Sequence, residues 1–150
     1  MSGSSFRFRL ERVRALRERS EDQAKQALAE AMQSHAVASQ ALDTAQAQVD
    51  SARAAQLAAA GALIAPADLV ARQAFLERSE RAVNASRQDL HRHEQHLEQR
   101  REELSKAAQE HKALERLKEN RRVDHERELA RREALTLDEI AITGYRRRAA

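Results

Sequence analysis

Residues 24–59 read AKQALAEAMQSHAVASQALDTAQAQVDSARAAQLAA, and residues 69–104 read LVARQAFLERSERAVNASRQDLHRHEQHLEQRREEL. In the first stretch an alanine stands at every seventh position, and in the second a leucine or valine does. These positions are Ala24, Ala31, Ala38, Ala45, Ala52 and Ala59, then Leu69, Leu76, Val83, Leu90, Leu97 and Leu104. A seven-residue apolar repeat is typical of α-helices that wind around one another and meet along a narrow seam.

The two repeats match when the chain is folded back on itself. Each alanine pairs with a residue of the second stretch so that the two numbers add to 128, from Ala24 with Leu104 to Ala59 with Leu69. A constant sum means that the partners run in opposite directions from a fold near residue 64. A small residue facing a large one lets the helix axes approach closely. We therefore expect an all-α fold, a long two-helix antiparallel coiled-coil hairpin with these residues in its seam.

Helix breakers mark the limits of the two helices. The only proline is Pro66, and the three glycines are Gly3, Gly61 and Gly144. Proline suits the first turn of a helix, where its missing N–H would have no partner. We expect the first helix at about 5–60, a turn at about 61–65, the second helix at about 66–143 and a basic tail at 144–150. All of them belong to a single expected domain, 1–150.

The second helix is expected to be the longer one. With partners adding to 128, Phe6 stands opposite Arg122, and residues after about Val123 have no partner in the first helix. The C-terminal end of the second helix should therefore project beyond the first. It does so at the end of the hairpin that carries both termini.

Composition argues against a globular enzyme. The chain is 41% hydrophobic, 3% aromatic and 34% charged, so it has too few large apolar residues to form the core of a globular domain. It has no cysteine, and its first five residues lack the apolar stretch of a signal peptide, so we expect a cytoplasmic protein. The longest weakly polar stretch, 57–67, is too short to cross a bilayer, so membrane association should be peripheral.

The sequence offers no catalytic or cofactor site. Three dispersed glycines cannot form a phosphate-binding loop, and no serine nucleophile stands with a plausible base and orienting acid. His93-Glu94-Gln95-His96 resembles the zincin motif HExxH but has one residue too few between its histidines. A weak divalent metal site with His35 across the seam is one interpretation, and polar seam residues that fix the register are the other. We favour the second and expect no enzyme activity, cofactor or metal.

Charge patterning favours a protein partner. The net charge is +3 and the sequence pI is about 9.8, but arginines alternate with glutamates and no aromatic residues are interleaved to stack on bases. We expect no nucleic-acid binding. The N-terminal apolar residues Phe6, Phe8, Leu10, Val13 and Leu16 stand among six arginines. They suit either a membrane surface or the closing end of the seam.

The N-terminal run resembles a known family. Residues 6–17, FRFRLERVRALR, are similar to the start of the flagellar FliJ family, which typically begins Phe-x-Phe-x-Leu-x-x-Val/Leu-x-x-Leu. Residues 137–141, LDEIA, followed by basic residues, resemble the end of many members. Gly144-Tyr145 between these two elements departs from the usual pattern. The resemblance covers essentially the whole chain.

This resemblance implies a non-enzymatic role in the flagellar type III protein export apparatus. Such proteins are central stalks that associate with the hexameric export ATPase, contact the cytoplasmic domain of the export gate and assist export chaperones. They act in the cytoplasm, peripheral to the inner face of the cell membrane at the flagellar base, in the assembly of the motility organelle. We expect this chain to be a monomer when isolated.

The stalk analogy also implies which residues contact each partner. The end with both termini enters the ATPase ring, and Phe75 is a candidate for the gate contact. The expected ring contacts are Phe6, Phe8, Leu10, Val13, Leu16, Leu129, Leu137, Ile140, Ile142 and Tyr145. Grouped exposed apolar residues commonly mark an interaction surface. The alternatives for the unpartnered end are a contact with a second copy or a frayed tail.

Two other functions stay open. The stalk protein of a virulence type III secretion system would share this architecture, although the Phe-x-Phe-x-Leu opening favours the flagellar version. A structural or adaptor coiled coil that associates with itself is the second alternative. A mass measurement separates the adaptor from a stalk, because a stalk should stay monomeric.

Overall fold

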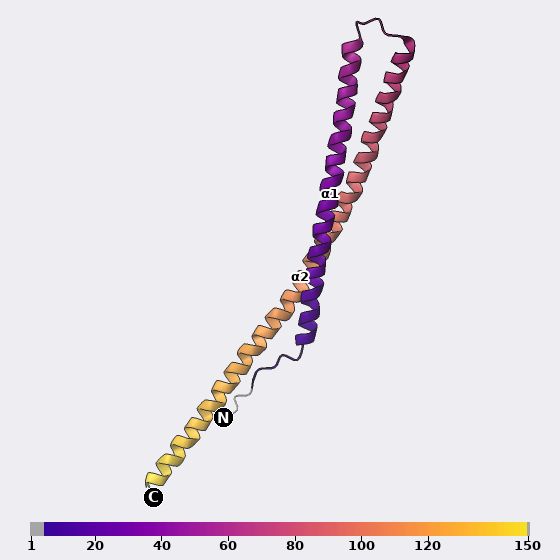
Figure 1. The fold of residues 1–150 in the computed structure, drawn as a ribbon. Coiled ribbons are helices and arrows are strands. Elements are labelled where there is room, and N and C mark those ends of the chain that lie inside the picture. The colour runs from indigo at the N-terminus through magenta and orange to yellow at the C-terminus, as the bar shows by residue number, and fades with distance from the viewer. Residues whose placement is uncertain (1–4, 150) are drawn as a thin grey trace. The chain divides into compact units, whose positions relative to one another are not determined.

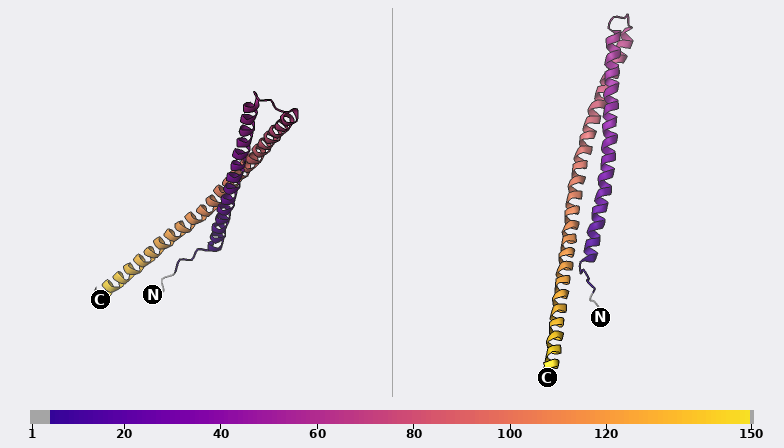
Figure 2. Two further views of the ribbon diagram at one scale, coloured as in Figure 1. Left: turned by 45° about the horizontal axis from the view of Figure 1, so that its top comes forward. Right: turned by 90° about the vertical axis from the view of Figure 1, so that its left-hand side faces the viewer.

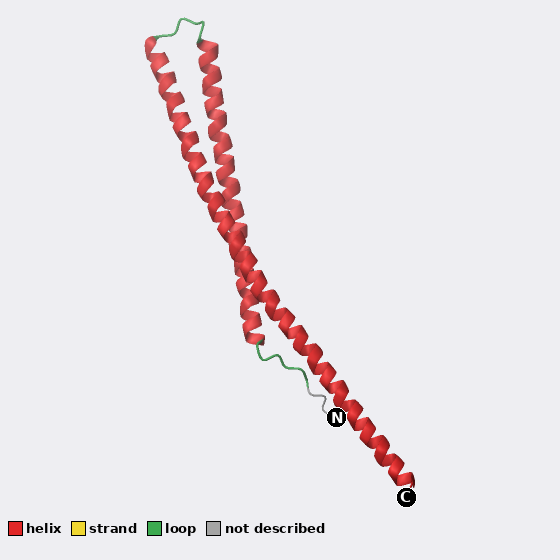
Figure 3. Ribbon diagram, turned by 180° about the vertical axis from the view of Figure 1, so that it is seen from behind, coloured by secondary structure: helices red, strands yellow, loops and turns green. Residues whose placement is uncertain are grey.

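The structure is a computed structural model that describes residues 5–149, and it consists of two helices. Helix α1 spans Glu11–Ala59 and helix α2 spans Pro66–Ala149 (Figure 1). The part of the chain that the structure describes contains no strand (Figure 3). The two long helices pack against each other, which confirms the all-α hairpin.

The chain divides into two compact units. The hairpin unit is Asp22–Ser105, and it holds the turn with most of α1 and the first part of α2. The terminal unit combines the residues up to Glu21 with those from Lys106 onward.

Helix α1 begins at Glu11 rather than near residue 5, since residues 5–8 have no regular secondary structure and residues 9 and 10 form a turn. Phe6 and Phe8 are half-buried, whereas Ser5, Arg7 and Arg9 are exposed. The helix then starts with the Glu11 N–H donating to the Phe8 carbonyl at 3.3 Å. The apolar packing of the two phenylalanines thus takes the place of a further helical turn.

Helix α2 begins at Pro66, and Asp68 in its first turn suits the positive end of the helix dipole. It continues through Gly144 to Ala149, so the expected tail after residue 143 is helical. A glycine inside a helix costs only about 1 kcal/mol relative to alanine. Arg146, Arg147 and Arg148 lie in the last turn, where positive charge interacts favourably with the helix dipole.

In the hairpin unit α1 runs beside the first part of α2 (Figures 1 and 2). The residues buried between the two helices follow the seven-residue repeat. The structure buries Ala31, Ala38, Ala45, Val83 and Leu97. The half-buried members of the two series are Ala24, Ala52, Ala59, Leu76, Leu90 and Leu104. A narrow seam of this kind leaves most other side chains of the hairpin in solvent.

The best-packed part of the seam lies around Val49. This side chain is 2% exposed and clusters with Ala45 and Val83, against which Leu42 and Leu76 also pack. Full burial of a valine contributes about 1.5–3 kcal/mol to folding. The buried Ser79 is satisfied locally, because its hydroxyl donates to the Phe75 carbonyl at 3.0 Å.

The seam opens toward the turn. Leu69 was expected in the seam but is 53% exposed, and every residue of 65–75 is exposed. The two helices draw apart there, as Figure 1 shows at the end next to the connecting loop. The separation leaves a hollow of about 610 Å³ lined by Ala59, Leu69 and Val70, among others.

Candidate functional site

The start of α1 is joined to α2 by charged side chains in the terminal unit. Four pairs cross between the two helices, and they are Arg14 with Glu115 at 2.8 Å, Arg17 with Glu110 at 2.7 Å, Lys118 with Glu11 at 3.0 Å and His111 with Glu21 at 2.7 Å. Ala107 is the one buried apolar residue that the described part of this unit contains. Charge therefore replaces apolar contact in this stretch of the seam.

Arg14 is the centre of this network. Its guanidinium contacts Glu11 at 2.8 Å, Glu18 at 3.3 Å and Glu115 at 2.8 Å, and its side chain is only 17% exposed. The hydrogen bond from Arg14, with a further one from Lys118, holds the pKa of Glu11 below its usual value. Arg14 likewise lowers the pKa of Glu115, and the two glutamates raise the pKa of Arg14. The charged forms of Glu11, Arg14 and Glu115 therefore stabilise one another.

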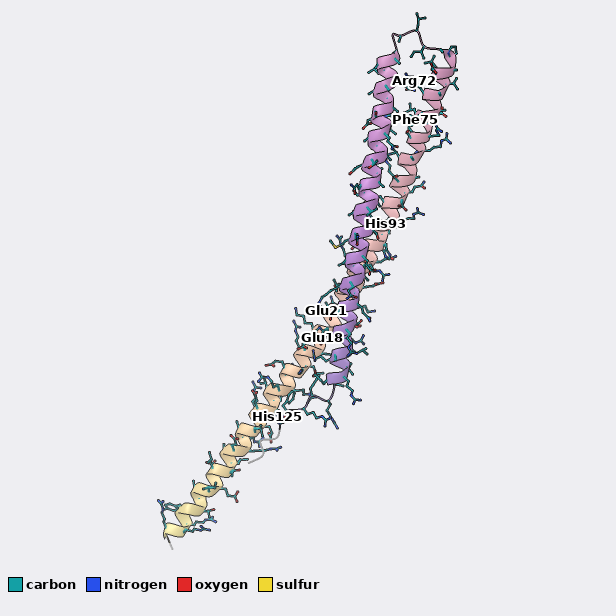
Figure 4. The ribbon with its side chains drawn as sticks, in the orientation of Figure 1. Glu18, Glu21, Arg72, Phe75, His93 and His125 are labelled. Atoms are coloured by element: carbon teal, nitrogen blue, oxygen red, sulfur yellow. The ribbon has the colours of Figure 1, made fainter. Side chains whose placement is uncertain are left out.

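His111 lies between carboxylates from both helices. Its Nδ1 is 2.7 Å from Oε2 of Glu21 on α1, and its Nε2 is 3.4 Å from Oε1 of Glu115 on α2. Nε2 is buried and makes no hydrogen bond of good geometry. The imidazole thus joins the two helices through the contact of its Nδ1 with Glu21. Glu18, Glu21 and His125 of this unit are labelled in Figure 4.

Acid should weaken this network, and a carbon-13 NMR titration checks the expectation. Because the pKa of Glu115 is lowered in the folded chain, its contribution to stability is present above the ordinary value of 4.5 and is lost as the pH falls through the folded-state pKa. We expect Glu115 to titrate below that ordinary value in the original chain and at a higher pH in the variant Arg14→Gln, which removes the contact. An unchanged midpoint in the variant would contradict the Arg14 contact.

The irregular N-terminal segment, residues 5–10, lies beside α2. The rings of Phe6 and His125 have centroids 5.7 Å apart and are tilted by 56°. Phe6, Phe8, Leu117 and His125 line a hollow of about 650 Å³, together with several charged neighbours. The two expected partner-binding phenylalanines are thus partly covered by their own chain.

Three other expected contact residues are Leu10, directly before α1, and Val13 and Leu16 on α1. All three are exposed, and Leu16 is the most exposed of them. Leu10 nevertheless lines the hollow that also contains Leu117 and His125 of α2. On the neighbouring turns of α1, Arg14 and Arg17 contact α2 through their charged groups. Closure of the seam by the N-terminal apolar residues stays a prediction.

The C-terminal part of α2 exposes its apolar residues in the same way. Every residue of 130–148 is exposed, and Leu129 is half-buried. The large apolar side chains are Leu135, Leu137, Ile140, Ile142 and Tyr145, and their exposed fractions run from 55% to 76%.

These side chains occupy two faces of the helix. Leu135 and Ile142 continue the seven-residue series that contains Ser79, whereas Leu137 and Ile140 lie on another side. At 3.6 residues per turn, Leu135 and Leu137 are separated by about 160° around the axis. A partner on only one side of α2 would leave one set in water.

Phe75 lies on α2 near the turn, in the hairpin unit (Figure 4). It is half exposed and, with Ala52, Ala55 and Arg72, lines a hollow of about 330 Å³. The Arg72 guanidinium donates to the Ala55 carbonyl at 3.3 Å. Phe75 is therefore accessible to a partner, and it belongs to a different unit from the apolar residues near the termini.

Three of the four histidines of the hairpin unit lie near carboxylates. His91 lies 3.7 Å and His35 4.0 Å from Glu94, and His93 lies 3.6 Å from Asp89. The described residues contain no group of three or more histidine, cysteine or acidic side chains arranged to hold a metal ion. None of the described helices has an apolar stretch long enough to span a bilayer.

The charged network was missed by the sequence analysis, although a signal for it exists. Continuing the alanine series backward from Ala24 by seven residues gives Arg17, and continuing the leucine series forward from Leu104 gives His111 and then Lys118. The seven-residue repeat therefore continues from the hairpin unit into the terminal unit, where charged or titratable residues stand at its positions.

Comparison with protein-family models shows which family the chain belongs to. The family model for the flagellar FliJ protein matches residues 6–150. The chain belongs to the FliJ family. This family consists of export-related proteins of the flagellum and not of enzymes, so the chain has a role related to flagellar protein export. Searches among curated proteins and among solved structures found no match. The match includes both the irregular Phe6–Leu10 segment and the exposed end of α2 of this FliJ-family chain.

Proposed function

We propose that this FliJ-family chain is a non-enzymatic stalk that couples the hexameric export ATPase to the export gate. The observation that carries the proposal is the exposed C-terminal part of α2, whose apolar side chains occupy two faces. Such a helix is stabilised by a partner that surrounds it. The pore of a ring meets that requirement, whereas a flat surface does not.

The start of α1 supports the same partner. Leu10, Val13 and Leu16 face solvent in the unit that also contains the end of α2. Apolar groups of this size gain stability when a partner covers them. Phe6 and Phe8 belong to the proposed contact as well. To reach the ring they would leave the surface of α2, where Phe6 packs beside His125 in the isolated chain. The proposed ring-binding surface thus combines both ends of the chain.

The proposed coupling between this chain and the nucleotide states of the ring depends on the mismatch between a single chain and six subunits. A single helical chain in a sixfold ring cannot make the same contacts with all six subunits, so it binds some nucleotide states of the ring better than others. A ligand shifts a conformational equilibrium by its difference in affinity for the two states. The chain therefore changes ATP turnover without carrying out any chemistry.

The gate contact is proposed for the other unit. Phe75 and the apolar residues beside the turn are accessible there. Binding of the cytoplasmic domain of the gate and of export chaperones would place the protein in the cytoplasm, at the inner face of the cell membrane beneath the flagellum.

ATP hydrolysis by the isolated export ATPase hexamer tests the proposal. Adding this chain should raise the turnover of the hexamer, while the chain alone hydrolyses nothing. Unchanged turnover with a fully helical chain present would overturn the ring contact. The mass of the isolated chain gives a second readout, because an adaptor that associates with itself would bury the same apolar residues in an oligomer and a stalk would stay monomeric.

A further inference from the structure

We propose that the start of α1, residues 11–21, is an electrostatic latch that opens from α2 while the hairpin unit remains folded. The latch residues are defined by the cross-helix pairs of the terminal unit, and they are Glu11, Arg14, Arg17 and Glu21 on α1 with Glu110, His111, Glu115 and Lys118 on α2. The inference goes beyond the proposed function, since it concerns the isolated chain.

The first argument is what holds residues 11–21 in place. Their polar contacts to α2 are three ion pairs and one contact between a histidine and a carboxylate. Five of the eight side chains involved are more than one-third exposed, whereas Arg14, His111 and Glu21 are 16–19% exposed. The side chains of Arg17 and Glu110, for example, are both more than one-third exposed. Exposed ion pairs each contribute little to stability, and dissolved salt screens them. A segment held in this way opens more easily than one held by apolar burial.

The second argument is the contrast with the hairpin unit. Its seam contains Val49, Val83 and Leu97, all buried, and its core cluster is entirely apolar. Apolar burial does not depend on screened charge, and concentrated salts of the excluded kind even strengthen it. The two units therefore respond differently to ionic strength, which makes partial opening distinct from unfolding of the whole chain.

The third argument is the geometry of the latch itself. Arg14 contacts Glu11 and Glu18 within α1 as well as Glu115 on α2, so these α1 carboxylates offer the guanidinium partners in the open form. Opening therefore leaves no isolated buried charge, which would otherwise be costly. It uncovers Ala107 and the half-buried Leu114 on α2. A partner that binds this uncovered face would favour the open form.

Hydrogen exchange of the isolated full-length chain tests the latch. Raising the sodium chloride concentration from about 0.01 M to about 1 M shortens the Debye length from about 30 Å to about 3 Å. Amides of residues 14–21 should then exchange about tenfold faster, whereas those of residues 31–49 keep their protection. Exchange at 14–21 that is fast at both salt concentrations would show simple fraying, and slow exchange at both would show a firm contact. Either result would overturn the latch.

Matched substitutions distinguish the effect of losing the cross-helix pairs on hydrogen exchange from the effect of losing positive charge in general. Arg14→Gln with Arg17→Gln removes two pairs that join the helices, and it should open residues 14–21 at low salt. The control is Arg92→Gln with Arg101→Gln, which removes the same charge from two pairs that lie within α2, Arg92 with Asp89 and Arg101 with Glu98. Equal exchange rates at 14–21 in the two variants would contradict the proposal.

Exchanging the two charges of one pair gives the sharpest test. Arg17→Glu alone and Glu110→Arg alone should each speed exchange at residues 14–21. The double variant restores an ion pair with reversed signs and should bring exchange back to within about twofold of the original rate. If the double variant exchanges as fast as the single ones, this pair does not hold the latch. Circular dichroism in each case checks that the chain remains helical.

Discussion

Val49→Asp is expected to lower the free energy of unfolding of the hairpin unit by about 3 kcal/mol or more. Val49 is the most buried side chain of the seam and packs with Ala45 and Val83. An aspartate there would place a carboxylate among apolar groups, with no cation in the core cluster to pair with it. Thermal and urea unfolding followed by far-ultraviolet circular dichroism measure the change.

Val37→Asp is the matched control for this prediction. It makes the same replacement on the same helix at a residue that is 62% exposed, and surface substitutions usually change stability by less than about 0.5 kcal/mol. Similar losses in the two variants would mean that the apolar seam is not what holds the hairpin together. No loss in either would argue against the coiled coil itself.

Ile140→Asp should weaken stimulation of the export ATPase by about tenfold or more, while the chain stays folded. Ile140 is 62% exposed and has no core contact to lose, so its replacement leaves the helices intact. In the proposed ring complex, however, the same side chain is covered, and a carboxylate would be buried without a partner. Turnover of the hexamer against the concentration of the added chain gives the shift in apparent affinity.

Val37→Asp again supplies the control, because Val37 and Ile140 are equally exposed but belong to different units. The control variant should stimulate the hexamer as the original chain does. If both variants lose stimulation equally, the effect comes from general charge and not from the end of α2. If Ile140→Asp unfolds the helices, the side chain has an intramolecular role that its exposure does not suggest.

The sequence predicted the hairpin unit well because its signal is periodic. A seam of two helices requires an apolar residue at regular intervals, and the repeats of alanine and leucine meet that requirement directly. Ala31, Ala38 and Ala45 are buried, as are Val83 and Leu97 on the facing helix. Near the turn the repeat continues, but Leu69 is exposed because the helices separate before they reach it. Periodicity alone does not report the distance between the helices.

The terminal unit was harder to predict because several weak preferences compete there. Phe6 and Phe8 suit an amphipathic helix as well as an irregular segment, and in the structure Phe6 packs beside His125 from an irregular segment. Gly144 suggested a helix end, although one glycine is a small cost in a long helix. The orientation of Leu16 followed from neither pattern, since it depends on which face the arginines of α1 turn toward α2.

The pairing of small and large residues in the seam also limits how this protein can vary in length. An insertion or deletion in one helix alone would shift the alanines on the side away from the turn against their counterparts on α2. Only matched changes of whole heptads in both helices keep Ala45 opposite Val83. Seven residues correspond to about 10.5 Å along a helix. Natural length variants of the hairpin unit should therefore differ by whole heptads in each helix, which means by steps of about 10.5 Å in length.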